Sequence, residues 1–175
     1  MLAANGVRAD EARRSVAEFA SGYASVRVFV ESFRDGFLPY DGGDVKQFFE
    51  QLKAEVSPDV IFTHQRSDLH QDHRIVSELT WNTFRDHFIL EYEIPKYDGD
   101  LSAPNVFVNL PAPIAERKVD LLLSHFDSQR NKSWFTADLF QGLMRLRGME
   151  SNSPSGHAEA FYCRKVVIAL NANEH

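Results

Sequence analysis

The sequence has little cysteine, no long apolar run and no excess of positive charge. Its 175 residues include one cysteine, Cys163, which excludes an intramolecular disulfide and suits a reducing compartment, so the cytoplasm is the expected location. No apolar run approaches the roughly 20 residues of a membrane span, and no signal peptide opens the chain. The formal net charge of -6 argues against nucleic acid as the main partner, because a phosphate backbone requires a basic surface.

Helix and strand patterns alternate along the chain, and we expect residues 1–175 to form a single domain. Apolar periodicity predicts helices over 10–23, 44–56, 69–85, 114–128 and 137–147, and strands over 25–31, 60–63, 88–93, 106–110 and from 160 to near 169. This alternation predicts an α/β fold, with a mostly parallel sheet flanked by helices.

The start of the sequence departs from this plan. A doubly wound α/β domain usually opens on a buried strand, whereas residues 1–7 indicate a loop that leads into a helix. We therefore expect the first β-α unit to be missing and the domain to be incomplete at its N-terminus. Unpaired strand edges invite association with other chains, so a homo-oligomer is left open.

A histidine motif stands where a strand should end and a helix begin. Residues 68–73 read D-L-H-Q-D-H and follow the apolar strand pattern of residues 58–63. Ligands bind at this edge of an open α/β sheet. His70 and His73 share a helix face, and histidine is a usual ligand of zinc. Asp68 with Gln71 has the form of a capping box that starts the helix. The motif indicates a metal-assisted hydrolase.

Other interpretations of these residues stay open. His70 and His73 are also compatible with a solvated helix N-terminus. We interpret His64 as a structural histidine, with an approach to the site from the strand end as the alternative. Cys163 lies in a predicted strand and is better explained as a buried thiol than as a nucleophile. A nucleotide-binding domain ranks last, because no G-x-G-x-x-G loop follows a strand.

Several segments together resemble one family. P-D-V-I-F-T-H followed by D-L-H-Q-D-H-R-I-V is similar to the signature of the zinc-dependent PIG-L/LmbE-like de-N-acetylases. In the same order as in that family, residues 8–12 resemble its R-x-x-E-A helix start, 33–38 its D-G-x-L segment, 125–129 its H-x-S-Q helix end and 158–161 its A-E-A-F close. The resemblance implies a Rossmann-like fold. It also implies a hydrolase that removes the N-acetyl group from an N-acetylglucosamine-type sugar conjugate.

The resemblance also implies roles for individual residues. His73 matches a zinc ligand, and His70 matches the histidine beside the scissile carbonyl, where it stabilises the oxyanion or protonates the leaving amine. Asp72 matches a carboxylate that orients a histidine. Arg8 and Asp35 match segments that line the substrate pocket. A helix-start charge and an Asp-Gly turn are their structural alternatives.

One family element has no counterpart here. Family members open on A-H-P-D-D-E, which supplies two zinc ligands and a general base, and no such segment occurs in this sequence. With His73 as the one matched ligand, we expect the chain alone to bind zinc weakly or not at all, because catalytic zinc normally has three protein ligands. The sequence therefore leaves two functions open. One is a deacetylase of which this sequence lacks the N-terminal segment. The other is a non-catalytic remnant that serves as an interaction or sugar-binding module.

Overall fold

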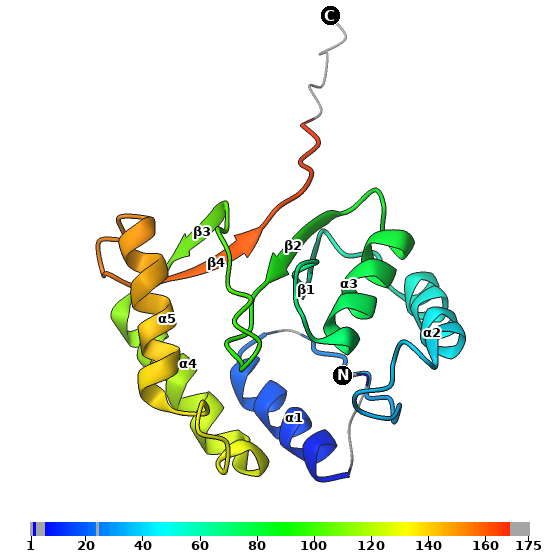
Figure 1. Cartoon of the computed structure of the whole chain (residues 1–175), viewed down its shortest axis with the longest axis horizontal. Coiled ribbons are helices and arrows are strands. Elements are labelled where there is room, and N and C mark those ends of the chain that lie inside the picture. Colours follow the sequence, from blue (N-terminus) through cyan, green and yellow to red (C-terminus); the bar gives the residue numbers. More distant parts are fainter. Residues whose placement is uncertain (1, 3–5, 24, 169–175) are drawn as a thin grey trace, which may run out of the picture.

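The computed structural model describes Leu2, residues 6–23 and residues 25–168 (Figure 1). Within these residues the elements are α1 (Gly6–Phe19), α2 (Gly42–Glu55), β1 (Val60–His64), α3 (Gln71–Thr83), β2 (Phe88–Tyr92), β3 (Val106–Asn109), α4 (Ala112–His125), the 3-10 turn η1 (Asp127–Gln129), α5 (Ala137–Glu150) and β4 (Ala158–Tyr162). The α/β class predicted from the alternating pattern is confirmed. None of the helices in the described ranges is long and apolar enough to cross a membrane.

The sheet is mixed, which corrects the expectation of a mostly parallel one. Among the described strands the order is β1-β2-β4-β3. β1 runs parallel to β2, whereas β4 runs antiparallel to both β2 and β3. The connections give the reason. One helix, α3, separates β1 from β2 and returns the chain to the same direction, whereas the two helices α4 and α5 separate β3 from β4 and reverse it.

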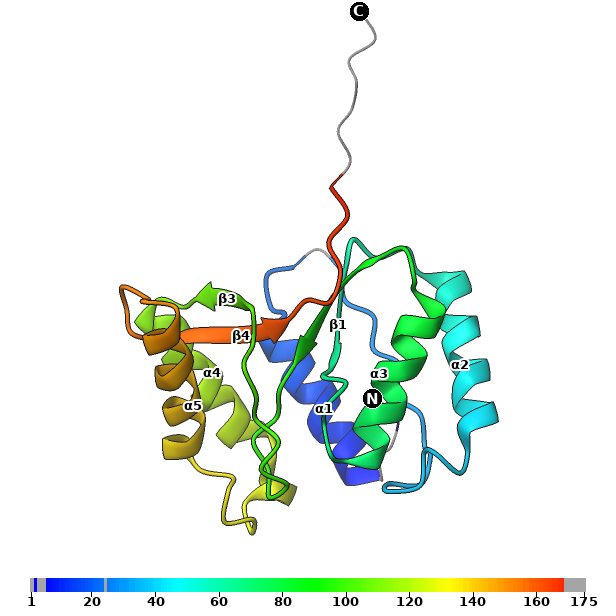
Figure 2. The ribbon, with the colours of Figure 1, turned by 45° about the horizontal axis from the view of Figure 1, so that its top comes forward.

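The helices form two groups around this sheet. Figures 1 and 2 show α2 and α3 beside β1 at one end of the molecule, and α4 and α5 beside β3 and β4 at the other. Helix α1 packs against α4, α3 against β1 and α5 against β4. The histidine motif lies where the C-terminal end of β1 leads into the start of α3.

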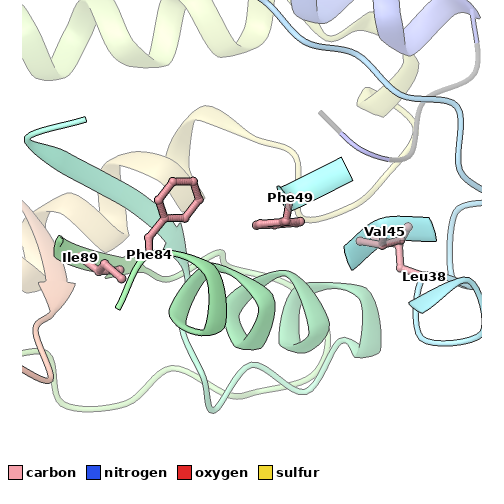
Figure 3. Close-up of a cluster of buried hydrophobic side chains, with 5 residues drawn as sticks. All are labelled: Leu38, Val45, Phe49, Phe84 and Ile89. Atoms are coloured by element: carbon pink, nitrogen blue, oxygen red, sulfur yellow. The ribbon is translucent and has the colours of Figure 1, made fainter. Parts of the chain in front are cut away.

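Apolar residues of the first group fix the position of α3. Figure 3 shows Val45 and Phe49 of α2 with Leu38, Phe84 and Ile89, and all five side chains are buried. Burial of apolar side chains of this size stabilises the fold by about 1.5–3 kcal/mol each. This cluster joins α2 to Phe84, directly after α3, and to Ile89 of β2, while α3 itself packs against α2 and β1.

The strand predicted over residues 25–31 is not formed. These residues have no regular secondary structure, and an isolated bridge occurs at Ser32, next to a hydrogen bond from the Phe33 backbone N–H to the Leu2 carbonyl. Val26 and Val28 are exposed, so their alternating pattern does not pack against a neighbouring strand. The predicted end of the last strand, near residue 169, lies outside the described residues.

Candidate metal centre

Helix α3 begins two residues later than the capping pattern predicts. His70, and not Asp68, is the N-cap residue, and its Nδ1 accepts a hydrogen bond from the backbone N–H of Asp72 at 3.3 Å. The Asp68 carboxylate instead accepts from the backbone N–H of His70 at 2.8 Å and contacts the ring Nδ1 of His73 at 2.9 Å. The Asp68 carboxylate thus links the start of α3 to the ring of His73.

Three side chains converge at this helix start. His64 from the end of β1, Asp68 and His73 each offer one ligand atom, and these atoms lie within 4.8 Å of one another. The His73 ring stacks on two neighbours: its centroid lies 3.9 Å from that of His64 and 4.5 Å from that of His70. His64, which we interpreted as structural, therefore lies beside the motif, and it forms with Asp68 and His73 a group that could hold a metal ion.

Burial keeps the His64 imidazole neutral. Loss of solvent, assisted by the neighbouring His73, lowers the pKa of His64 to about 3. Its Nδ1 is buried without a hydrogen-bond partner among the described residues, and Tyr92 Oη lies 3.4 Å from its Nε2. Burial and the charge of Asp68 raise the pKa of Tyr92 to about 12, so this hydroxyl stays protonated at neutral pH. A neutral imidazole is the form that binds a metal ion.

Asp68 is held in its charged form. Burial acts to raise the pKa of this carboxyl, but the hydrogen bonds from His73 and the His70 backbone outweigh it and lower the pKa to about 2. Lys96, on the segment between β2 and β3, places its Nζ 3.1 Å from Asp68 and also contacts Asp100. Asp100 in turn accepts from the Leu69 backbone N–H at 2.8 Å. The sequence patterns did not single out Lys96 or Asp100, because they come from a distant segment.

Asp72 connects α3 to the loop before α2. Its carboxylate accepts hydrogen bonds from the backbone N–H groups of Gly36, at 2.6 Å, and Leu38, at 3.1 Å. Gly36 has φ +80°, which agrees with the Asp-Gly turn considered as an alternative for Asp35. The carboxylate that contacts His73 is that of Asp68. The catalytic role assigned to Asp72 stays a prediction.

We expect the change Asp72→Ala to lower the free energy of unfolding by about 2 kcal/mol, because it leaves two backbone donors without their acceptor, one of them on the buried Leu38. Asp44→Ala, at an exposed position of α2, is the control and should change stability by no more than about 0.5 kcal/mol. Urea denaturation of both variants measures the difference. Equal midpoints for the two would contradict the anchoring role.

The motif faces a cavity of about 620 Å³. All five residues singled out from the sequence, Arg8, Asp35, His70, Asp72 and His73, line it, as do His64 and Lys96. Arg8 and Asp35 form an ion pair of 2.9 Å across the cavity wall. Tyr97, Gln129, Lys132 and Trp134 also line the cavity. The structure therefore brings the predicted site residues together, while the substrate contacts assigned to Arg8 and Asp35 stay a prediction.

Sequence comparison finds a family match for part of the chain. Residues 3–84 match the PIG-L family, described as GlcNAc-PI de-N-acetylase. This range includes the histidine motif and both the Arg8 and Asp35 segments. No curated protein sequence matches the chain.

Two solved structures share the fold. The N,N'-diacetylchitobiose deacetylase from Pyrococcus horikoshii, complexed with its inhibitor MPG, is 17% identical over 87% of this chain, with a TM-score of 0.60. The conserved protein TT1542 from Thermus thermophilus is 20% identical over 91% of this chain, with a TM-score of 0.57. The chain spans 62% of the length of the first protein and 75% of the second. The resemblance to PIG-L/LmbE-type deacetylases is confirmed, and the missing opening unit stays a prediction.

Proposed function

We propose that this chain, whose residues 3–84 match the PIG-L family and which shares its fold with a diacetylchitobiose deacetylase, hydrolyses the N-acetyl group of an N-acetylglucosamine-type sugar conjugate with the help of a bound zinc ion. The observation that carries the proposal is the convergence of His64, Asp68 and His73 on one point beside the cavity. The match to a GlcNAc-PI de-N-acetylase and the fold shared with a diacetylchitobiose deacetylase support an N-acetylated sugar as the substrate class.

The residues present fit a zinc ion. Two histidines and one carboxylate form a ligand set that zinc accepts in catalytic sites. The His64 ring has a low pKa and is neutral, and its buried Nδ1 has no hydrogen-bond partner among the described residues. Asp68 is charged. Both residues therefore offer deprotonated ligand atoms at neutral pH. Zinc bound there would polarise the amide carbonyl and lower the pKa of a bound water to about 7.

His70 is suited to act as a hydrogen-bond donor. Its Nδ1 accepts from the Asp72 backbone N–H, so in the neutral ring the proton is on Nε2. A ring fixed in this tautomer can donate a hydrogen bond from Nε2–H to the oxyanion that forms on the amide carbonyl. His70 lines the cavity and stacks on His73, so the donor lies next to the proposed ligands.

The rest of the cavity wall is suited to a sugar. Tyr97 and Trp134 offer aromatic rings, and Lys132 lies with its Nζ 5.4 Å from the Trp134 ring centroid. Arg8 and Asp35 offer a donor and an acceptor for sugar hydroxyls. A cavity of about 620 Å³ lies within the range that small-molecule ligands occupy. The non-catalytic alternative has no separate observation in its favour.

Metal titration combined with an amine assay tests the proposal. The metal-free protein should bind one equivalent of zinc and then release the free amine from methyl N-acetyl-β-D-glucosaminide. A chelator should abolish the release, and added zinc should restore it. Zinc-loaded protein that binds the glycoside without releasing amine would overturn the deacetylase and indicate the sugar-binding module. Absence of zinc binding would overturn the proposed metal centre.

A further inference from the structure

A second cavity lies beside the first, between α4, α5 and β4. Its volume is about 340 Å³, near the lower end of the range for small-molecule sites. Apolar side chains make up most of its wall: Leu122 from α4 and Phe126 directly after it, Phe140, Leu143 and Met144 from α5, Phe135 just before α5, and Ala158 and Ala160 from β4. The function proposed above does not use this cavity.

The charged groups at its wall are already paired. Arg147 donates to both carboxylate oxygens of Glu93, at 2.7 and 2.8 Å, and each of these side chains is 4% exposed. Lys118 forms an ion pair with Glu159. A charged occupant would therefore have to compete with existing ion pairs, and burial of a polar group without a partner is unfavourable. The wall favours an apolar occupant.

The two cavities adjoin each other. Ile94, Gln129 and Trp134 line both of them. Trp134 is half-buried and packs edge-on against Phe135, with their ring centroids 5.8 Å apart. A molecule that occupies the first cavity and contacts Trp134 therefore stands at the entrance of the second. One ligand with a polar part and an apolar part can fill both.

We propose that the second cavity binds an apolar substituent carried by the same molecule whose N-acetyl sugar lies beside His64, His70 and His73. This inference rests on the proposed function and names its substrate class: an N-acetylglucosamine conjugate with an apolar aglycone. The sugar is held at the polar wall, and the aglycone passes Trp134 and is buried among the side chains of α4 and α5.

Isothermal titration calorimetry of the full chain, loaded with zinc, measures the binding affinity for two probes, methyl and hexyl N-acetyl-β-D-glucosaminide. The hexyl glycoside should bind more tightly, by roughly three- to fourfold for each methylene group that enters the cavity. Equal affinity for the two glycosides would overturn the proposal.

Variants locate the hexyl group. Two independent variants, Leu143→Trp and Leu122→Trp, each place a larger side chain in the cavity. Each should reduce the ratio of hexyl to methyl affinity. Leu146→Trp is the matched control on the same helix: Leu146 is exposed and does not line the cavity, so the ratio should stay at the wild-type value. Thermal melting checks that each variant is folded. A hexyl preference unchanged in both cavity variants would overturn the proposal.

Amine release, followed on the same samples, separates this inference from the proposed function. Hydrolysis of both glycosides with equal affinity overturns the apolar subsite and leaves the deacetylase standing. A hexyl preference that the cavity variants remove, without amine release, supports the apolar subsite and overturns the deacetylase. No binding of either glycoside overturns both.

Discussion

Replacement of His73 by alanine is expected to remove bound zinc and amine release together. His73 contributes one of the three converging ligand atoms, contacts the Asp68 carboxylate at 2.9 Å and stacks on His64 at 3.9 Å. Without it two ligands remain, fewer than catalytic zinc sites use. Loss of a residue that only orients a ligand costs about 10- to 100-fold in metal affinity or activity, so loss of the ligand itself should cost more than that.

His157→Ala is the control for this prediction. His157 lies at the start of β4, outside the residues that line the first cavity, and its ring contacts the Ser155 carbonyl at 3.1 Å. It should retain one equivalent of zinc and wild-type amine release. Elemental analysis after gel filtration and a fluorogenic amine assay give the two quantities. Stoichiometric zinc in His73→Ala would show that His73 is not a ligand.

The sequence predicts the helices well because their signals are local. The apolar positions of α2, for example, predict that Val45, Phe48, Phe49 and Leu52 face inward. Val45 and Phe49 are buried, and Phe48 and Leu52 are half-buried. Sheet topology depends on contacts between distant segments. The antiparallel position of β4 follows from the number of helices between strands, and the alternating residues 25–31 form no strand because no neighbour pairs with them in the described part of the chain.

The candidate site shows the same contrast between local signals, which the sequence carries, and contacts between distant segments, which it does not. His70 and His73 are adjacent in a motif with helical spacing, so the sequence alone places them together. His64 and Asp68 were interpreted as a structural histidine and a helix cap, because a sequence does not show that the end of β1 lies against the start of α3. Lys96 comes from the β2–β3 connection, and its contact with Asp68 depends on the sheet order. A strand-end histidine next to a D-x-H-x-D-H motif is the signal that would have identified His64 as a further candidate ligand.

His70→Ala is expected to retain zinc and to slow amine release on the order of 10²-fold, if its imidazole donates to the oxyanion or to the leaving amine. His70 is not among the three side chains whose ligand atoms converge, so the metal content should be unchanged. The variant also removes the N-cap acceptor for the Asp72 backbone N–H, which should cost about 1 kcal/mol in stability.

His70→Asn separates the effect of the lost imidazole on amine release from the effect of the lost N-cap on stability. Asparagine is a favourable N-cap residue and can accept from the backbone N–H in place of Nδ1, so this variant should recover most of the lost stability. It lacks an imidazole, so its rate of amine release should stay as low as that of His70→Ala. Zinc content, urea denaturation and turnover, measured on both variants, make the comparison. Loss of metal equal to that of His73→Ala would place His70 among the ligands. Recovery of turnover with stability in His70→Asn would restrict His70 to a structural cap.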